Sequence, residues 1–299
     1  AVGSLPAVTG IISGNNDVVL VTGGTLTLAS SLNAGTGNVG LQAGGAVTQG
    51  AAGTITANNL NLQGNGPFTL TNAANDVNTV GANTNGPVQI TDANTLTVGA
   101  VPGVGTLPAV SGITTNNNDV TLITGGALTL NNQINAGTGN IGLQSAAGVT
   151  QGGAGSLTAN SLNLQGSGAF TLTNAGNNVN VMGANVTGLL QYTAANGLTV
   201  GSVPAVGIIP AINGITSGNN DIALITGGAL TLNQTVNAGS GNLGLSSNGP
   251  VTQGAAGTIT ANNLNLQGNG PYALTNGGND VATLGGTTAG NVQYADANS

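Results

Sequence analysis

The seven aspartates are the only side chains of this sequence that carry a charge at neutral pH, so acid-base chemistry would depend on them. Asp76 and Asp92 are closely spaced, and two carboxylates can act as general acid and base in the cleavage of a polysaccharide. One period of 102 residues later these positions hold Asn178 and Ala194, and one further period later they are aspartates again. Because the pair is not kept, and the chain has no Lys, Arg or His to assist it, we expect no enzymatic activity.

Three further aspartates, Asp17, Asp119 and Asp221, each end an Asn-Asn-Asp triplet at the start of a strand pattern. Such oxygen-rich triplets could suggest calcium, but one carboxylate per repeat makes a poor calcium site. The chain also lacks the G-G-x-G-x-D pattern of calcium-binding β-solenoids. Asp and Asn hold turns through bonds from the side chain to the backbone. The sequence therefore predicts structural turn residues here, and neither a metal nor another cofactor.

A glycine pattern of the dinucleotide-binding type, G-x-G-x-x-G, occupies residues 35–40 and returns at 137–142 and 239–244. A nucleotide site of this kind needs a helix that begins at the glycines and an acidic residue about 20 positions later. A strand pattern follows the glycines instead, and no Asp lies near position 60. We expect these glycines to form turns.

Thr-x-Thr triplets could form the flat threonine ranks with which some solenoids bind ice. These triplets begin at Thr25, Thr54, Thr69, Thr95, Thr171 and Thr258. Substitutions such as Ala127 for Thr25 and Ser156 for Thr54 interrupt the ranks one period later. Threonine is also common on any solvated strand. Ice binding is thus only a minor alternative.

The composition excludes several classes of partner. The chain contains no Lys, Arg, His, Glu, Cys or Trp, and its net charge is −7. Nucleic acids and anionic membrane surfaces bind mainly through Lys and Arg, so we expect neither as a partner. No apolar run approaches the roughly 20 residues that span a bilayer, and the start of the chain does not resemble a signal peptide. The absence of Cys fits an exported protein stabilised by stacking.

The elements that position these residues repeat every 102 residues without insertion or deletion. Residues 47–67 are identical to residues 251–271. The period divides the chain into repeats at 5–106, 107–208 and 209–299, the last of them truncated. An invariant period indicates units that pass a fixed geometry to the next unit, as in solenoids. We expect one continuous β-solenoid over residues 1–299, without capping segments and therefore a fragment of a longer array.

Turn signals within the repeat recur about every 20 residues, at Gly24, Gly45, Gly66, Gly86 and Gly105. They divide the first repeat into five rungs, at about 5–24, 25–45, 46–66, 67–86 and 87–106. Alternating apolar and polar residues between the turns indicate strands with one buried face. The sequence therefore predicts an all-β fold, a right-handed parallel β-helix. Roughly fifteen rungs spaced about 4.8 Å apart would form a rod on the order of 70 Å long.

Aromatic residues return at fixed positions in this period: Phe68, Phe170 and Tyr272 form one set, and Ile90, Tyr192 and Tyr294 form another. A stacked aromatic platform could bind sugar. We favour a column of aromatic residues that fills the core of a narrow aliphatic tube.

The sequence resembles the repeats of filamentous-haemagglutinin-like bacterial exoproteins at residues 47–50 (VTQG), 54–62 (TITANNLNL), 70–72 (LTN) and 75–77 (NDV). The resemblance covers the whole chain and is one of composition and spacing. It implies a right-handed parallel β-helix, export by two-partner secretion and an adhesive or biofilm role. The amino-terminal secretion domain of that family is not in this sequence.

These observations favour a structural or adhesive rod of a secreted bacterial adhesin or surface filament. Its expected partners are neighbouring repeats of the same or identical chains, and host or cell-surface glycans. A carbohydrate-binding or carbohydrate-cleaving β-helix is the alternative. That alternative predicts aromatics and carboxylates clustered at one place, and the sequence shows no such cluster.

Overall fold

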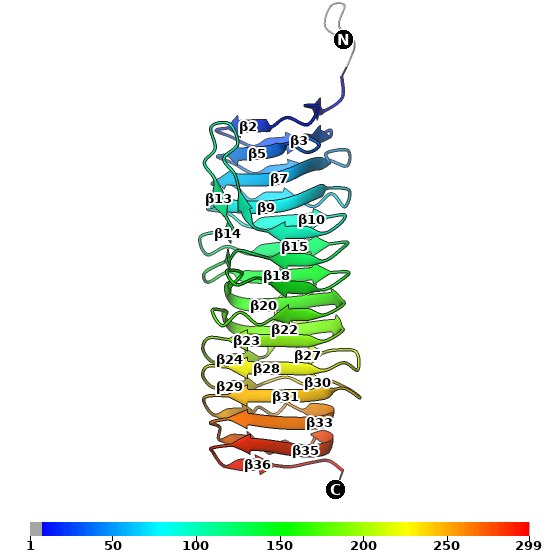
Figure 1. Cartoon of the computed structure of the whole chain (residues 1–299), viewed down its shortest axis with the longest axis vertical. Helices are drawn as coiled ribbons and strands as arrows, with labels where there is room; N and C mark the ends of the chain where they lie inside the picture. The colour runs from blue at the N-terminus through cyan, green and yellow to red at the C-terminus, as the bar shows by residue number, and fades with distance from the viewer. Residues whose placement is uncertain (1–7, 299) are drawn as a thin grey trace, which may run out of the picture.

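Short parallel strands make up most of residues 8–298, the residues that the computed structural model describes (Figure 1). They form a β-solenoid of about 14 turns with about 21 residues in each turn. The prediction of an all-β solenoid is confirmed. The described part of the chain has no helix that is long and apolar enough to cross a membrane. Residues 5–7 of the first repeat, and Ser299, lie outside the described residues.

Most strands recur in every repeat. In the first repeat they are β1 (Ile11–Ile12), β2 (Val18–Thr22), β3 (Leu26–Leu28), β4 (Leu32–Asn33), β5 (Asn38–Ala43), β6 (Val47–Gln49), β7 (Ile55–Gly64), β8 (Phe68–Leu70), β9 (Asp76–Thr84), β10 (Val88–Asp92), β11 (Leu96–Val98) and β12 (Ala100–Val101). In the second they are β13 (Val110–Ser111), β14 (Ile113–Thr114), β15 (Val120–Thr124), β16 (Leu128–Leu130), β17 (Ile134–Asn135), β18 (Asn140–Ser145), β19 (Val149–Gln151), β20 (Leu157–Ser167), β21 (Phe170–Leu172), β22 (Asn178–Thr187), β23 (Leu190–Ala194), β24 (Leu198–Val200) and β25 (Ser202–Val203). In the third they are β26 (Ile212–Asn213), β27 (Ile215–Thr216), β28 (Ile222–Thr226), β29 (Leu230–Leu232), β30 (Val236–Asn237), β31 (Asn242–Ser247), β32 (Val251–Gln253), β33 (Ile259–Gly268), β34 (Tyr272–Leu274), β35 (Asp280–Thr288) and β36 (Val292–Tyr294).

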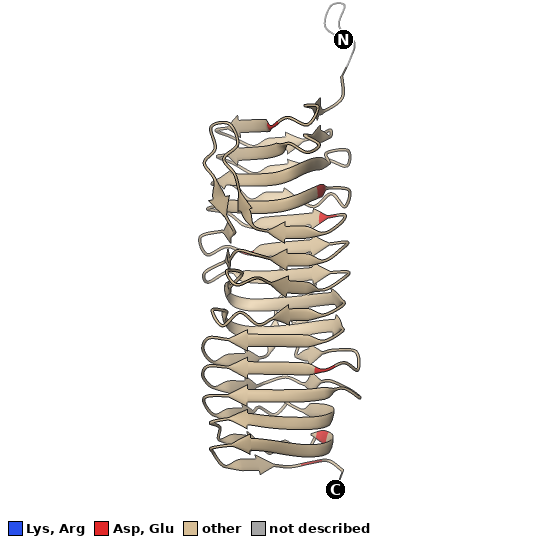
Figure 2. Cartoon of the chain, viewed as in Figure 1, with Lys and Arg blue, Asp and Glu red and all other residues tan. Residues whose placement is uncertain are grey.

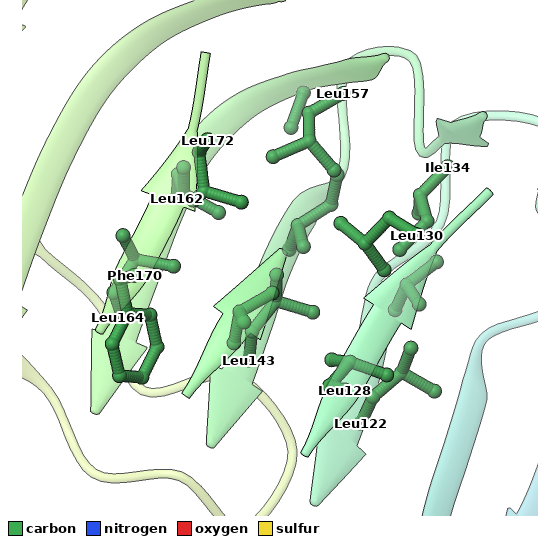
Figure 3. Packing of buried hydrophobic residues seen from close by; sticks show 14 of the residues in the cluster. Leu122, Leu128, Leu130, Ile134, Leu143, Leu157, Leu162, Leu164, Phe170 and Leu172 are labelled. Carbon is green, nitrogen blue, oxygen red and sulfur yellow. The ribbon is translucent and has the colours of Figure 1, made fainter. Parts of the chain in front are cut away.

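The core is a column of aliphatic side chains that continues from turn to turn. Strand residues alternate between the inside and the outside of the tube, and the inward ones are mainly Val, Leu and Ile. Val39, Leu41, Leu60 and Leu62 are at most 1% exposed. Figure 3 shows the same packing in the second repeat, where side chains of consecutive turns project into one shared space. Each such buried side chain contributes about 1.5–3 kcal/mol, and this burial stabilises the rod along its whole length.

The second repeat begins one strand further round the rod than the first. Val18 pairs with Val39 on the next turn, and later turns keep this spacing of 20 or 21 residues. Val120 lies one period after Val18 but pairs with Val88 of β10. Val88 does not belong to the column of stacked strands that contains Val18 and Val39. The same shift recurs in the third repeat, where β28 pairs with β23. With three strands per turn, each repeat therefore comprises four complete turns and one additional strand.

A β-hairpin interrupts the turn that joins one repeat to the next. The two arms of the first hairpin are the antiparallel strands β12 and β13. One repeat later, β25 and β26 form the arms of a second hairpin. The fifth rung expected at residues 87–106 is therefore not a single turn. It contains β10, β11 and the first arm of the hairpin, and the hairpin accounts for the wider pairing interval between repeats.

Candidate functional site

The hairpins lie against an outer column of small and polar residues, which we call the hairpin face. It consists of the outward-pointing residues on four consecutive turns of one repeat. Its members are Val19, Gly40, Asn61 and Gly81 in the first repeat, Thr121, Gly142, Asn163 and Gly183 in the second, and Ala223, Gly244, Asn265 and Gly285 in the third.

Glycines allow the hairpin to approach the face closely. A Cβ atom added to Gly81 would lie 2.7 Å from Cγ2 of Val110, and one added to Gly142 would lie 2.9 Å from Cβ of Val206. These separations are shorter than van der Waals contact. Any larger residue would therefore displace the hairpin, and this explains why strand positions that normally disfavour glycine contain it.

Asparagine amides fix the middle of each hairpin. Nδ2 of Asn61 donates to the carbonyl oxygens of Pro102 (3.1 Å) and Pro108 (2.9 Å). Asn163 donates in the same way to Pro204 (3.2 Å) and Pro210 (2.9 Å) one repeat later. Both asparagines are 0% exposed beneath their hairpins.

The tip of the hairpin is a tight turn with an apolar underside. The amide of Val104 donates to the carbonyl of Leu107, the amide of Leu107 donates to the carbonyl of Val104, and both distances are 3.0 Å. Gly105 has a φ of +59°, which favours glycine at this position. Val104 and Leu107 are buried against the rod. The hairpin is therefore a packed strap that extends back over earlier turns of its own repeat.

Within residues 8–298, no hairpin covers the hairpin face of the third repeat. Adjoining hollows of about 140 and 470 Å³ lie over it, and both are lined by Ala223, Gly244 and Asn265. Asn265 is exposed, in contrast to its buried counterparts. A Cβ atom on Gly285 would have no neighbour within 4 Å. This site was not predicted from the sequence, although the Val-Pro and Leu-Pro or Ile-Pro pairs of the hairpins recur in it.

The predicted turn aspartates bind the next turn of the solenoid. Oδ1 of Asp17 accepts hydrogen bonds from the backbone amide and from Nδ2 of Asn38, both at 2.9 Å. Asp119 and Asp221 make the same pair of bonds one and two repeats later, at 2.8–3.1 Å. Each carboxylate thus links two turns that are 21 residues apart.

In two repeats the asparagine bound by the turn aspartate also accepts a hydrogen bond from an asparagine on the following turn, and we call this series an asparagine ladder. Nδ2 of Asn59 donates to Oδ1 of Asn38 at 2.7 Å, and the third repeat has the equivalent bond. The second repeat has Ser161 in place of Asn59, and Oδ1 of Asn140 is buried there without a partner among the described residues. The ladder is therefore incomplete in the second repeat.

A buried amide pair closes a bend in each repeat. Oδ1 of Asn177 accepts from Nε2 of Gln151 (2.7 Å) and from the amide of Leu157 (2.9 Å), and its Nδ2 donates to the carbonyls of Leu172 and Thr193. The equivalent pairs are Gln49 with Asn75 and Gln253 with Asn279. All three asparagines are at most 1% exposed. The Gln and the Asn of the pair keep the same spacing in every repeat, and this spacing is the sequence signal that could have predicted the pair.

The pair Asp76 and Asp92 is engaged in backbone bonding. Oδ2 of Asp92 accepts from the amide of Val77 (2.8 Å) and Oδ1 from the amide of Asn94 (2.9 Å). Asp92 is only 2% exposed, and burial, aided by repulsion from Asp76, raises the pKa of its carboxyl against the opposing effect of the two amides. Asp76 accepts a bond from Asn94 at 3.3 Å. A buried carboxylate with both oxygens bonded in this way cannot contact a polysaccharide.

The equivalent Asp296 lies on the last described turn and is more exposed. A hydrogen bond from the hydroxyl of Tyr294 (2.5 Å) is the main cause that lowers the pKa of this carboxyl. Desolvation first, and then the bond to Asp296, raise the pKa of Tyr294.

The aromatic residues are placed in the core but not in one column. Phe68, Phe170, Tyr192 and Tyr272 are at most 1% exposed, and Tyr294 is partly buried. Phe68 pairs with Val47 and Val88, whereas Phe170 and Tyr272 pair with other strands, because each repeat starts one strand further round. No aromatic platform for a sugar lies on the surface at these residues.

The residues of the glycine and threonine patterns lie in turns and strands of the solenoid. Strand β5 begins directly after Gly37, where a nucleotide-binding fold would begin a helix. Thr27, Thr48 and Thr69 do stack on consecutive turns, but the next position in the column is Gln89. This rank ends within the first repeat. A second rank, made of Thr79, Thr97, Thr129, Thr150 and Thr171, continues over five consecutive turns into the second repeat before Gln191 ends it.

Charges are few and all acidic, and they lie mainly where strands begin or end (Figure 2). Within residues 8–298, no three Asp side chains are grouped as ligands for a metal ion. No family model, curated protein or solved structure matches this chain. The fold and its faces place the chain in the class of repetitive parallel β-solenoids.

Proposed function

We propose that the chain is a structural and adhesive rod segment of a secreted bacterial adhesin or surface filament, and that it is not an enzyme. The observation that carries the proposal is the continuous aliphatic core, which extends through all repeats and is linked by hydrogen bonds parallel to the rod axis. Such a core resists bending and can hold a binding tip away from a cell.

The side chains support this proposal because their polar groups stabilise the rod itself. The aspartates link turns, the buried amides close bends, and the glycines receive hairpins. The exposed surface has few charges and is rich in Thr, Asn and Ala. A surface of this kind adheres through many weak contacts, and host or cell-surface glycans are the proposed partners.

The resemblance to filamentous-haemagglutinin-like repeats adds an extracellular location and export by two-partner secretion to the proposal. Neighbouring repeats or identical chains are the proposed structural partners, in filaments or lateral assemblies. Neither nucleic acid nor membrane insertion is part of this role.

Display of the chain on a non-adherent bacterium tests the proposal. We expect at least about a threefold increase in attachment to epithelial cells or glycan-coated surfaces, relative to display of an unrelated β-solenoid of similar length, because many weak contacts add up along a rod. Unchanged attachment would contradict adhesion. Release of reducing ends from a panel of polysaccharides by the purified chain would instead establish the carbohydrate-cleaving alternative.

A further inference from the structure

A polar groove lies on the second repeat, and we call it the amide groove. Strands β22, β24 and β29 line it on three consecutive turns, so it extends for about 10 Å along the rod. Its volume is about 440 Å³, and sites for small molecules commonly have roughly 300–1,000 Å³. Its polar lining consists of Asn178, Asn180, Asn196, Thr199 and Thr231.

The asparagines at the edge of the groove present hydrogen-bonding groups that are held in place. Nδ2 of Asn196 donates to Oδ1 of Asn178 at 3.1 Å, and this bond orients both side chains. Both residues are exposed, and neither Nδ2 of Asn178 nor Oδ1 of Asn196 has a hydrogen-bond partner among residues 8–298. The groove therefore offers a ligand one oriented donor and one oriented acceptor.

Two threonines form the floor of the groove. Thr199 lies opposite Thr231 on the adjacent turn, and both are partly exposed. Their hydroxyl groups can donate and accept, and they make no hydrogen bond within the part of the chain that the structure describes. Leu198 lies beside them and is buried. Hydroxyl, amide and aliphatic groups thus alternate over a short distance, as they do on a sugar ring.

The charges of the chain restrict the ligand to a neutral one. An anionic ligand would find no Lys, Arg or His to pair with, and the net charge of −7 repels it. A cation would need a carboxylate, and no Asp lines the groove. A neutral polar ligand remains, and its hydrogen bonds can be matched by amides and hydroxyls.

The equivalent place in the first repeat differs from the amide groove at two lining residues. Asp76 occupies the position of Asn178, and Thr95 occupies that of Gly197, whereas the remaining lining residues are of the same type in both repeats. Asp76 replaces the free amide donor by a charged acceptor. Thr95 adds a side chain where Gly197 has none. The first repeat is therefore a natural control for the groove.

We propose that the amide groove binds a neutral saccharide unit of a glycan. The amides of Asn178 and Asn196 bind hydroxyl groups of the sugar, and Thr199 and Thr231 contact its ring from the floor. This inference rests on the proposed adhesive function and names the ligand class and the site. One shallow site of this kind binds with a dissociation constant on the order of 1 mM, so firm attachment needs many rods.

Two variants remove binding in different ways. Gly197→Thr fills the groove, and Thr95 in the first repeat shows that the solenoid accommodates this residue, although a Cβ atom at Gly197 would lie 2.9 Å from the carbonyl oxygen of Ala229. We expect it to bind a saccharide at least about tenfold more weakly. Asn178→Ala removes the free donor at an exposed position, and we expect about fivefold weaker binding.

A third variant should create a second site. Asp76→Asn combined with Thr95→Gly gives the first repeat the same lining as the amide groove. The geometry is already present there, because Thr97 lies opposite Thr129 and Nδ2 of Asn94 donates to Asp76. We expect this double variant to bind at two places, and Asn94 reports on the new one.

Nuclear magnetic resonance of the full chain, labelled with ¹⁵N in asparagine, provides the test. The neutral probes are lactose, maltotetraose and chitotetraose, and the anionic probe is a heparin tetrasaccharide. We expect at least one neutral probe to shift the side-chain amide signals of Asn178 and Asn196 in the wild type, and also that of Asn94 in the double variant. Thermal unfolding of each variant checks that it is folded.

The proposal is overturned if no neutral probe shifts the signals of Asn178 and Asn196, or if the heparin tetrasaccharide binds there as tightly as the neutral probes. It is also overturned if folded Gly197→Thr or Asn178→Ala binds like the wild type, or if the double variant gains no site. Asn178→Ala and the double variant decide the matter even if Gly197→Thr does not fold.

The same probes distinguish this proposal from the adhesive role. Binding of a neutral probe in the groove without any gain of attachment in the display assay would refute adhesion and leave the groove established. Attachment without any shift at Asn178 and Asn196 would refute the groove and leave adhesion established.

Discussion

Val120 lies opposite Val88 on the adjacent turn, although the two residues are 32 positions apart and Val18, the periodic counterpart of Val120, stacks in another column. The interval is long because the hairpin leaves the rod between them. The hairpin then packs on the four preceding turns, so the irregular segment of each repeat contributes to the stability of the regular part.

The hairpin contact predicts different outcomes for one substitution in two repeats. Gly183→Val places a Cβ atom 2.8 Å from Cγ2 of Ile212 and 3.2 Å from Cγ2 of Val203, so the hairpin of the second repeat should detach, at a cost of about 1–3 kcal/mol. Hydrogen exchange of the amides of Val206 and Ile209 measures this detachment. The control is Gly285→Val on the open face, which should leave that exchange unchanged. Equal exchange in both variants would contradict the packing described here.

Completion of the asparagine ladder should stabilise the second repeat. Ser161→Asn supplies a donor for the buried Oδ1 of Asn140, as Asn59 does for Asn38. One recovered hydrogen bond to a buried acceptor adds about 1 kcal/mol to the free energy of unfolding. Guanidinium denaturation of the variant measures the gain. Ser161→Ala serves as the control, and a stability of Ser161→Asn no higher than that of the control would show that the ladder contributes nothing.

The buried amide pair predicts a large loss when it is removed. Asn177→Ala leaves the amide of Leu157 and the carbonyl of Leu172 without their partner, so we expect a loss of about 3 kcal/mol or more. The neighbouring Asn178 is exposed, and Asn178→Ala should change stability by less than about 0.5 kcal/mol. Thermal unfolding of the two variants compares them directly, and similar losses would argue against a structural network at Asn177.

The raised pKa of Asp92 predicts a pH-dependent stability with a definite sign. Because folding raises this pKa above the ordinary value of 3.8, the native state binds the proton more tightly than the unfolded state does. The contribution of Asp92 is therefore fully present below pH 3.8 and is lost as the pH rises through its folded pKa. Asp92→Ala, which introduces the residue found at position 194, removes this dependence. Denaturation midpoints between about pH 3 and 7 should fall less with rising pH in the variant than in the wild type. A larger fall of the midpoint in the variant than in the wild type would show that folding does not raise the pKa of Asp92.

The regular part of the fold could be predicted from the sequence because it depends on local alternation and an unbroken period. Leu60 and Leu62 alternate with polar residues, and this pattern alone places them inside. The rotation between repeats could not be predicted in this way, because equal sequence positions suggest equal spatial columns. The pairings of Val120 with Val88 and of Ile222 with Leu190 show that they differ.

The site was harder to predict than the fold because its contacts run backward over long intervals. Pro108 was recognised as part of the repeat but not as the acceptor for Asn61, which precedes it by 47 residues. The turn aspartates were recognised from the triplet alone, but the partner of Asp17 on the next turn was not named. Hydrogen bonds between residues so far apart depend on the number of residues in each turn, which the sequence gives only approximately.

The one-strand shift between repeats also determines which side of the rod each hairpin occupies. If every repeat comprised a whole number of turns, all straps would form a single ridge, and adjacent rods would align along that ridge into a flat ribbon. Here each strap lies one strand further around the rod axis than the strap of the preceding repeat. In the lateral assemblies that we propose, rods of this shape would contact their neighbours on several sides in turn, and this geometry would favour a three-dimensional mesh.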